Sequence, residues 1–482
     1  MFMKQKINIL LTLMLLFSES VNCTIITFAD AKVKAICVRK WDITGDGELD
    51  TGEAAHVTAI GSEFTGNNEI TSFDELKYFT GLEMIGRGTF SGCNNLTSVV
   101  IPENVEWIGD QSFYCKNLKK ITIPKSVKKI EEGAFRCDDL SSIHITDLAS
   151  WCGIDFGSYG SGNPLPRVKH FYLNDSEIID LVIPEGVQKF GTAFRGCNIF
   201  TSVKIPNSVN TIENGAFSGC KNLTRIEIGD GVQAIGDNAF YNCILLPSVT
   251  IPGNVTSIGE EAFRDCQNLA QVNICNGVQI LGYGAFKGCI NLPSIEFPNS
   301  LEVIEHGAFE GCEKLSKIVL GNGLKKVARA FPQSLTEVHI SDLASWCRIN
   351  FPDGSPLSIA KHLYMDGKEL RDAVIPDGVT SLGSGFAYCL SLVSVTIPNS
   401  VTEIEEHAFF RCSNLESVKT GDGVVSIGKS AFGYCSSLKE VELGSALKTI
   451  GEEAFYQCSN LPSIVIPDMV VTIGRCAFYN CI

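Results

Sequence analysis

One pattern of hydrophobic and polar positions returns through most of this chain. The stretches Lys221–Cys243 and Ile244–Cys266 have the same length, and Leu or Ile, Gly, Ala-Phe and Cys occupy matching positions in both. Ile226 and Ile228 alternate with polar neighbours, which predicts a half-buried strand. Proline often follows and marks the end of the strand, because it donates no ladder hydrogen bond. The Ala-Phe segment predicts a short helical turn whose phenylalanine joins a stacked core.

The repeat predicts a solenoid in which each turn buries the apolar side of its neighbour. Strand-like segments between Leu96 and Ile466 give about 18 units, and a period in the twenties is typical of leucine-rich repeats. The spacing is 22 in the first run of framework cysteines and 23 in the other two. These cysteines are Cys93, Cys115, Cys137, Cys197, Cys220, Cys243, Cys266, Cys289, Cys312, Cys389, Cys412, Cys435, Cys458 and Cys481.

Three segments carry a resemblance to a known family. They read CKNLTRIEI (Cys220–Ile228), VTIPGNVTSIGEEAF (Val249–Phe263) and CSNLESV (Cys412–Val418), and they resemble the BspA-like leucine-rich repeats. The resemblance implies a right-handed leucine-rich-repeat solenoid of the α/β type, with a parallel sheet on one face. It also implies extracellular display, because such proteins are typically surface adhesins and interaction proteins. We expect residues 81–482 to form the solenoid and residues 24–80 a small helical N-terminal cap.

Two longer units interrupt the period near residues 146–184 and 341–376, and both contain the sequence DLASWC. A nearby histidine makes each cysteine a candidate nucleophile, but no orienting third group or oxyanion hole is legible. We expect instead that Trp151 and Trp346 fill the core where the chain bulges outward. Flexible loops in these units are candidate contacts for a partner.

The first residues predict export. Lys4 and Lys6 precede the apolar run Ile7–Phe17, which is too short to span a bilayer, and a short polar stretch follows. Residues 1–23 therefore have the pattern of a secretory signal peptide, with a short membrane anchor as the alternative. Cys23 is either the last residue removed or the acylated first residue of a lipoprotein attached to the outer membrane. No other segment is long and apolar enough to cross a membrane.

Charge and cysteine content narrow the possible partners and bonds. A formal net charge of −15 argues against nucleic acid and anionic membranes as partners. Twenty cysteines in a secreted chain would suggest disulfides. The framework cysteines share one position, however, so their Cα atoms should form a column about 4.8 Å apart. Parallel side chains keep the Cβ atoms farther apart than the roughly 3.8 Å of a disulfide, so we expect a buried thiol ladder.

Residues 42–53 (DITGDGELDTGE) match a twelve-residue EF-hand calcium loop. Positions 1, 3, 5, 7, 9 and 12 are Asp42, Thr44, Asp46, Glu48, Asp50 and Glu53. Thr44 is a weaker ligand than aspartate, and no partner loop is evident. We predict a calcium site of extracellular-grade affinity, with a simple Gly/Asp turn as the alternative. Downstream, Ser72 and Glu75 predict a helix with a capping box.

The middle residue of each strand triplet should face solvent. These residues vary and are mostly polar: Val100, Thr122, His144, Lys204, Glu227, Thr250, Asn273, Glu296, Val319, His339, Thr396, Lys419, Glu442 and Val465. A repetitive polymer would favour one recurring residue, whereas variety suits a protein partner. We therefore predict a secreted or cell-surface adhesion protein that binds a large extracellular protein, such as a host matrix or cell-surface protein. The candidate contacts are Lys204, Glu227, His339, Trp151 and Trp346.

Two other functions compete with protein binding. Capture of polysaccharide often uses exposed aromatic residues, and the sheet positions above contain none. A secreted hydrolase needs clustered acids or a nucleophile on irregular loops, whereas the histidines are scattered and the carboxylates fall in repeat positions. We predict that the protein is not an enzyme, with calcium as its one candidate cofactor.

Overall fold

The computed structural model of the protein describes residues 23–481 and divides the chain into two compact units. Unit 1 ends at Ile179 and unit 2 begins at Asp180, and each is described by itself. The predicted signal peptide lies outside the described residues except for Cys23, which is exposed. No helix in the described part of the chain is long and apolar enough to cross a membrane.

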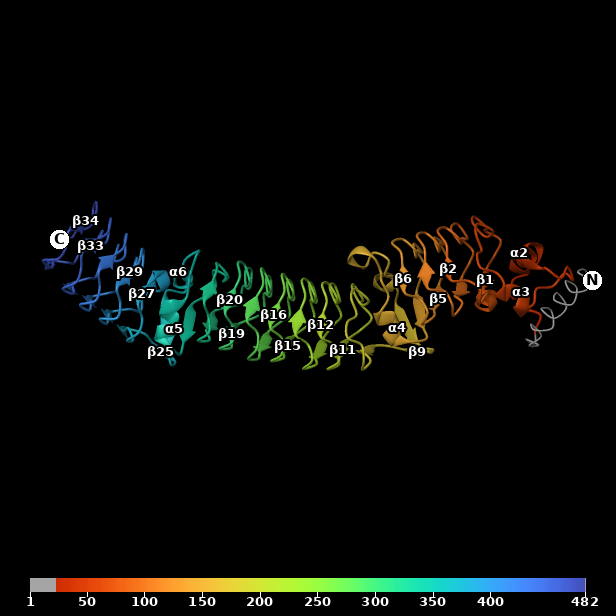
Figure 1. The fold of residues 1–482 in the computed structure, drawn as a ribbon, viewed down its shortest axis with the longest axis horizontal. Helices are drawn as coiled ribbons and strands as arrows, with labels where there is room; N and C mark the ends of the chain where they lie inside the picture. The colour runs from red at the N-terminus through yellow and green to blue at the C-terminus, as the bar shows by residue number, and fades with distance from the viewer. Residues whose placement is uncertain (1–22, 482) are drawn as a thin grey trace, which may run out of the picture. The chain divides into compact units, whose positions relative to one another are not determined.

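Unit 1 begins with two helices and continues as stacked parallel strands (Figure 1). The helices are α2 (Ala31–Trp41) and α3 (Thr51–Ala55). The main sheet has the order β1 (Ser72–Phe73), β3 (Ser98–Val100), β5 (Lys120–Ile123), β7 (Ser142–Ile145), β8 (His170–Leu173) and β9 (Ser176–Glu177). A second sheet contains β2 (Met84–Ile85), β4 (Trp107–Ile108) and β6 (Lys129–Ile130). The insert between β7 and β8 carries α4 (Leu148–Cys152), η2 (Ser158–Gly160) and η3 (Leu165–Arg167).

The segment after the two helices joins the sheet earlier than expected. Ser72 and Phe73 form β1, which pairs in parallel with β3, and only Asp74–Tyr78 forms a 3-10 helix, η1. The predicted capping box is wrong, because η1 has no side-chain cap and the Glu75 carboxylate accepts the N–H of Ala29 at 2.9 Å instead. Pairing with β3 satisfies the backbone groups of Ser72 and Phe73, which a helix would otherwise have to satisfy internally.

Unit 2 repeats the arrangement over more turns (green to blue in Figure 1). The longer strands are β10 (Asp180–Val182), β11 (Ser202–Ile205), β13 (Arg225–Ile228), β15 (Ser248–Ile251), β17 (Gln271–Ile274), β19 (Ser294–Glu296), β21 (Lys317–Val319), β23 (Glu337–Ile340), β24 (His362–Met365), β26 (Asp372–Val374), β28 (Ser394–Thr396), β30 (Ser417–Lys419) and β32 (Glu440–Glu442). All their pairings are parallel except the hairpin of β24 with β25 (Lys368–Glu369).

Two-residue strands form a second set of parallel sheets in unit 2. They are β12 (Thr211–Ile212), β14 (Ala234–Ile235), β16 (Ser257–Ile258), β18 (Ile280–Leu281), β20 (Val303–Ile304), β22 (Lys326–Val327), β27 (Ser381–Leu382), β29 (Glu403–Ile404), β31 (Ser426–Ile427), β33 (Thr449–Ile450) and β34 (Thr472–Ile473). The second insert carries α5 (Leu343–Arg348) and α6 (Leu357–Ala360), and η4 (Ser384–Phe386) follows β27. The two units contain about 17 turns, and the strand expected at 463–466 does not form.

The short turn predicted after each two-residue strand forms in the repeat turns of the described chain, but only η4 is regular enough to be a 3-10 helix. The Ala-Phe segments form hydrogen-bonded turns, as where the N–H of Tyr241 donates to the carbonyl of Asn238 at 3.1 Å. Asn238 and Asn242 have φ angles of 55° and 58°. A right-handed helix cannot continue through a left-handed residue, so each turn closes after a few residues.

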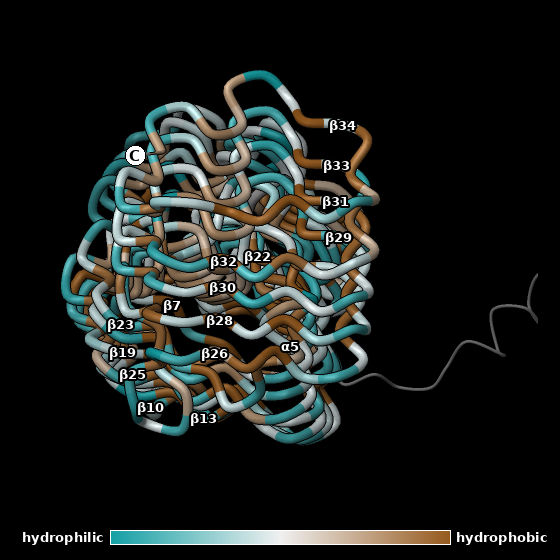
Figure 2. Tube along the Cα trace, turned by 90° about the vertical axis from the view of Figure 1, so that its left-hand side faces the viewer, coloured by the Kyte–Doolittle hydropathy of each residue, from teal (hydrophilic) through white to brown (hydrophobic). Residues whose placement is uncertain are grey.

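The core of unit 2 is a stack of phenylalanine rings, as the repeat predicts. From Phe194 to Phe331, one ring per turn lies 5.1–5.9 Å from the next between centroids, with planes 3–11° apart. A second stack runs from Phe386 to Phe478. In Figure 2, brown marks the hydrophobic strands β31, β33 and β34, whereas many connecting loops are teal.

The framework cysteines form the predicted thiol ladder. Every cysteine within residues 23–481 is free. Twelve of these thiols donate to the phenylalanine carbonyl of the preceding turn, for example Cys243 to Phe217 at 3.3 Å and Cys266 to Phe240 at 3.2 Å, whereas Cys389 lies against the Ser391 hydroxyl. Burial raises the pKa of Cys266 to about 12, so this thiol keeps its proton at neutral pH.

Candidate functional site

The solvent face of the longer strands in unit 2 carries the varied positions predicted from sequence. Lys204 and Glu227 are register neighbours on β11 and β13, both are exposed, and their charged groups lie 3.9 Å apart. Lys419 and Glu442 form a shorter pair at 2.6 Å. Other exposed middle positions are Thr250, Asn273, Glu296 and Thr396. Exposed ion pairs contribute little to stability, so these side chains are available for binding.

His339 has a different environment from Lys204 and Glu227. Its side chain is only 13% exposed, because the imidazole stacks on Tyr364 with ring centroids 4.6 Å apart and planes 9° apart. The same pair occurs in unit 1, where His144 stacks on Tyr172 at 4.4 Å and 15°. The structure therefore makes His339 part of a ring stack rather than an isolated contact.

The two ring stacks belong to equivalent hairpins. In unit 1, β8 and β9 are antiparallel, and His170 Nδ1 lies 2.6 Å from Glu177 Oε1. In unit 2, β24 and β25 repeat this geometry, with His362 Nδ1 2.6 Å from Glu369 Oε1. The expectation that the sheet face lacks aromatic residues is wrong here, because the inserts add a strand with tyrosine in register with each histidine. The alternation in KHFYL and KHLYM was the available signal.

Trp151 and Trp346 lie inside the core. Each exposes 1% of its surface, and each packs on a phenylalanine of its own insert with ring centroids 5.1 Å apart. Neither indole can touch a partner directly, so their effect on binding would act through the surface around them. Burial also raises the pKa of Cys152 and Cys347 to about 12, so neither is a thiolate nucleophile at neutral pH.

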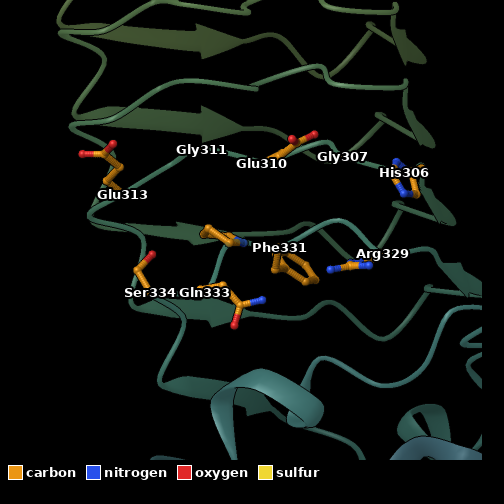
Figure 3. A pocket seen from close by; sticks show the side chains of 10 residues that line it. His306, Gly307, Glu310, Gly311, Glu313, Arg329, Phe331, Gln333 and Ser334 are labelled. Carbon is orange, nitrogen blue, oxygen red and sulfur yellow. The ribbon is translucent and has the colours of Figure 1, made fainter.

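A groove of about 640 Å³ opens in unit 2 where one turn is shortened (Figure 3). Figure 3 shows Glu310 and Glu313 on one side of the groove and Arg329, Phe331 and Gln333 on the other. The groove falls between Cys312 and Cys389, where the regular spacing of framework cysteines is lost. That gap is visible in the sequence, but it does not reveal which groups the missing residues leave uncovered.

Backbone groups that other turns cover remain open in this groove. In the preceding turn, the N–H of Gly288 donates to the carbonyl of Glu310 at 2.8 Å. The equivalent N–H of Gly311 has no acceptor within residues 23–481. The groove thus offers a backbone donor beside the aromatic ring of Phe331 and the guanidinium of Arg329.

The predicted calcium loop lies between α2 and α3 and is closed by its own carboxylates. Asp42 accepts the N–H groups of Gly45 (2.6 Å) and Gly47 (2.9 Å). Glu53 accepts the N–H groups of Ile43 and Thr44, both at 2.9 Å.

These hydrogen bonds lower the pKa of both carboxyl groups. The hydrogen bond from the Gly47 N–H lowers the pKa of Asp42. Burial acts to raise the pKa of Glu53, but the hydrogen bonds from backbone N–H groups outweigh it, so this pKa is also lowered. The remaining predicted ligands, Thr44, Asp46, Glu48 and Asp50, lie on the same loop. Among the described residues, no three His, Cys, Asp or Glu side chains are grouped to hold a metal ion. Calcium binding therefore stays a prediction.

Stacked turns of parallel strands, one phenylalanine per turn and a leucine in each unit define a leucine-rich-repeat solenoid. The chain belongs to the family of the BspA type leucine rich repeat region, whose model matches residues 58–152, 167–292, 261–345 and 357–482. No curated protein matches the chain closely enough to count as a relative.

Several solved structures are similar to the chain. A leucine-rich repeat protein from Bacteroides ovatus ATCC 8483 is 26% identical, with 80% of this chain and 85% of that chain covered and a TM-score of 0.43. A leucine rich cell surface protein from Faecalibacterium prausnitzii A2-165 is 24% identical, with coverages of 75% and 83% and a TM-score of 0.30. The pneumococcal vaccine antigen PcpA is 20% identical, with coverages of 64% and 66% and a TM-score of 0.26.

Proposed function

We propose that the protein is secreted or displayed at the cell surface and binds a large extracellular protein, such as a host matrix or cell-surface protein. The observation that carries the proposal is the contrast between the two sides of each strand. On β11 and β13, Val203 is buried in register with the partly covered Ile226, whereas Lys204 and Glu227 between the apolar positions are exposed and differ in charge. A fixed interior with a variable exterior lets neighbouring turns build a composite binding surface.

Membership in the BspA-type family supports this proposal over an enzyme, because the family is one of repeat proteins. A hydrolase remains the weakest alternative, since the cysteines of both inserts, the buried Cys152 and the partly covered Cys347, stay protonated at neutral pH. Polysaccharide capture is the stronger alternative, and Tyr172 and Tyr364 give it a sheet-face aromatic that the repeat alone does not supply.

A binding screen with matched variants tests the proposal. Wild-type protein is compared, on purified extracellular-matrix proteins and on a glycan array, with a variant in which Lys204, Glu227, Thr250 and Asn273 are all alanine. Single substitutions should weaken binding slightly and the fourfold variant progressively more, with unchanged unfolding midpoints. Binding to glycans alone would favour the polysaccharide alternative. Loss of turnover of a small molecule after one substitution would favour an enzyme.

We also propose that Asp42–Glu53 is an EF-hand-like calcium loop within the N-terminal cap, and that Cys23 carries a lipid anchor if it is retained. A carboxylate has about four lone-pair sites, so Asp42 and Glu53 can accept backbone N–H groups and still ligate a cation. Calorimetry should show one calcium site of roughly millimolar affinity that Glu53→Gln abolishes. Glu63→Gln, outside the loop, is the control, and no calcium-dependent heat in wild-type protein would exclude the site.

A further inference from the structure

Large side chains occupy a strained backbone position in several consecutive turns of unit 2. The residue before each framework cysteine of unit 2 has positive φ, and in earlier turns it is Gly196, Gly219, Asn242, Asp265, Gly288 or Gly311. In later turns it is Tyr388 (φ 65°), Arg411 (60°), Tyr434 (60°) and Gln457 (61°). A left-handed conformation disfavours residues with bulky side chains, whereas glycine, asparagine and aspartate tolerate it. Strained residues of this kind point to a functional constraint.

These side chains form one aromatic–arginine cluster, consisting of Tyr388, Phe410, Arg411, Tyr434 and Lys361. The Phe410 ring meets Tyr388 and Tyr434 edge-on, with centroids 5.7 Å and 5.5 Å apart. The guanidinium of Arg411 lies 4.7 Å from the Tyr434 centroid, and Lys361 Nζ lies 4.5 Å from the Tyr388 centroid. Arg411 is exposed, and Tyr434 exposes 37% of its surface.

The two cations of the cluster lack carboxylate partners. Lys419 and Lys429 in the same region pair with Glu442 and Glu452. Within residues 23–481, neither Arg411 nor Lys361 forms an ion pair with an acid. Lys361 Nζ donates to the Ser358 carbonyl, so the exposed guanidinium of Arg411 is the charge most available to a carboxylate from outside the chain.

Arg264 provides an internal contrast to Arg411. It also lies over a tyrosine, 5.7 Å from the Tyr241 centroid, but its charge is satisfied by Glu261 and Asp265. Arg264 and Arg411 in unit 2 thus both lie over tyrosine rings, and only the Arg411 guanidinium is unpaired by acids of the described chain.

We propose that the aromatic–arginine cluster is a docking site for an acidic segment of a partner protein. Tyrosine and arginine dominate the binding energy of protein interfaces, and a guanidinium held by stacking presents its donors to carboxylates with little further loss of freedom. Cations lie over both tyrosine rings, Lys361 over Tyr388 and Arg411 over Tyr434, so the cluster presents positive charge to an acidic peptide rather than an open aromatic platform to a sugar. The inference rests on the proposed function only in that the partner is a protein.

The test measures fluorescence anisotropy of a labelled peptide of alternating glutamate and leucine. A glutamine–leucine peptide and heparin serve as neutral and non-protein polyanionic controls. The variants are Tyr388→Gly, Arg411→Gly and Tyr434→Gly, singly and together. Two further variants serve as controls. Gln457→Gly removes a large side chain from the same left-handed backbone position in a turn outside the cluster, and Arg264→Gln removes the arginine that is already paired with acids. The fourfold sheet variant keeps the cluster intact, so it separates failure at this site from failure at the sheet.

We expect the acidic peptide to bind and Arg411→Gly to weaken binding by at least about tenfold, whereas Gln457→Gly and Arg264→Gln leave it unchanged. Each glycine variant should keep or raise the thermal unfolding midpoint, since glycine relieves the left-handed position. No binding by wild-type protein would overturn the proposal. Equal binding of heparin through the same residues would also overturn it. If the unfolding midpoint falls in the cluster variants but not in Gln457→Gly, the rings serve packing rather than docking, and the proposal is again overturned.

Discussion

The inserts of unit 1 and unit 2 share the sequence DLASWC, a buried tryptophan and a hairpin, yet the turn before each insert is finished differently. In unit 1 that turn, Ile130–Leu140, keeps Cys137, whose thiol donates to the Phe113 carbonyl at 2.8 Å. Arg167 from the insert then covers the Phe135 carbonyl, with Nη1 at 3.1 Å. The first insert thus supplies a side-chain donor, Arg167, to a phenylalanine carbonyl that a framework cysteine of the next turn would otherwise reach.

In unit 2 the corresponding turn, Val327–Leu335, is two residues shorter and has no cysteine. Ile359 stands at the place of Arg167 in the insert and has no donor to offer. The groove beside Phe331 is the result. The comparison teaches that similar inserts can finish the preceding turn differently: an insert side chain covers the last phenylalanine carbonyl in unit 1, whereas the larger groove, of about 640 Å³, lies beside the shortened turn of unit 2.

The largest expected effect comes from the tryptophan that both inserts bury. Trp151→Ala and Trp346→Ala should each lower the free energy of unfolding by about 3–5 kcal/mol, because each leaves a large cavity. Denaturant unfolding followed by circular dichroism measures both losses. Similar losses would show that the two inserts are equally well packed, and a loss below about 1 kcal/mol in either would contradict the role of the tryptophan as a core plug.

Arg167→Ala should remove the hydrogen bond by which the first insert covers the turn before it. It leaves the Phe135 carbonyl without its guanidinium donor and should cost about 1–3 kcal/mol of unfolding free energy. Arg136→Ala, in the same turn but exposed, is the matched control and should change stability by less than about 0.5 kcal/mol. Equal effects of the two substitutions would mean that the donor does not replace the ladder bond.

Hydrogen exchange sharpens the comparison from the side of unit 2. The amide of Gly288 donates to the next turn, whereas that of Gly311 faces the groove without an acceptor in the described chain. We expect Gly311 to exchange at least about tenfold faster than Gly288 under native conditions, because protection follows the hydrogen bond. Equal protection of both amides would show that the groove is closed in solution.

The smallest effect concerns pH in unit 1. Burial and the nearby Lys120 lower the pKa of His144, and Asp175 raises it less. The unfolded chain, with a pKa of about 6.5, then binds a proton more readily, so stability falls as pH drops from about 6.5 toward the folded pKa. The loss should be the smallest of these effects and should vanish in His144→Gln. Lys120→Gln should shrink it and Asp175→Asn enlarge it, as read from unfolding midpoints across this range.

Much of the solenoid could be predicted because each residue type keeps one position in the repeat. Ile226, Phe240 and Cys243 recur at fixed spacing, and strand, ring stack and thiol ladder follow from that spacing alone. The short second strands were not predicted, since two residues are too few to show alternation. The predicted turns do not continue as helix because Asn238 and Asn242 adopt left-handed backbone, which sequence patterns for helices do not register.

The candidate sites were less predictable, because they arise where the repeat changes. Tyr364 joins the sheet face through an insert strand, and the groove at Phe331 reflects residues that are missing. Tyr388, Arg411 and Tyr434 stand out only once their φ angles are known. The repeat explains what is constant, whereas the candidate sites lie at positions that depart from it.

The central claim is that a reduced, buried framework carries a variable exterior, and a thiol titration of denatured, unreduced protein tests it most directly. All twenty cysteines are free in the structure, and the column donates to backbone carbonyls. We predict that nearly all of them react, at the least about a dozen, and that few react before denaturation because burial raises their pKa. A count near zero in denatured protein would mean that disulfides hold the turns together and would contradict the account.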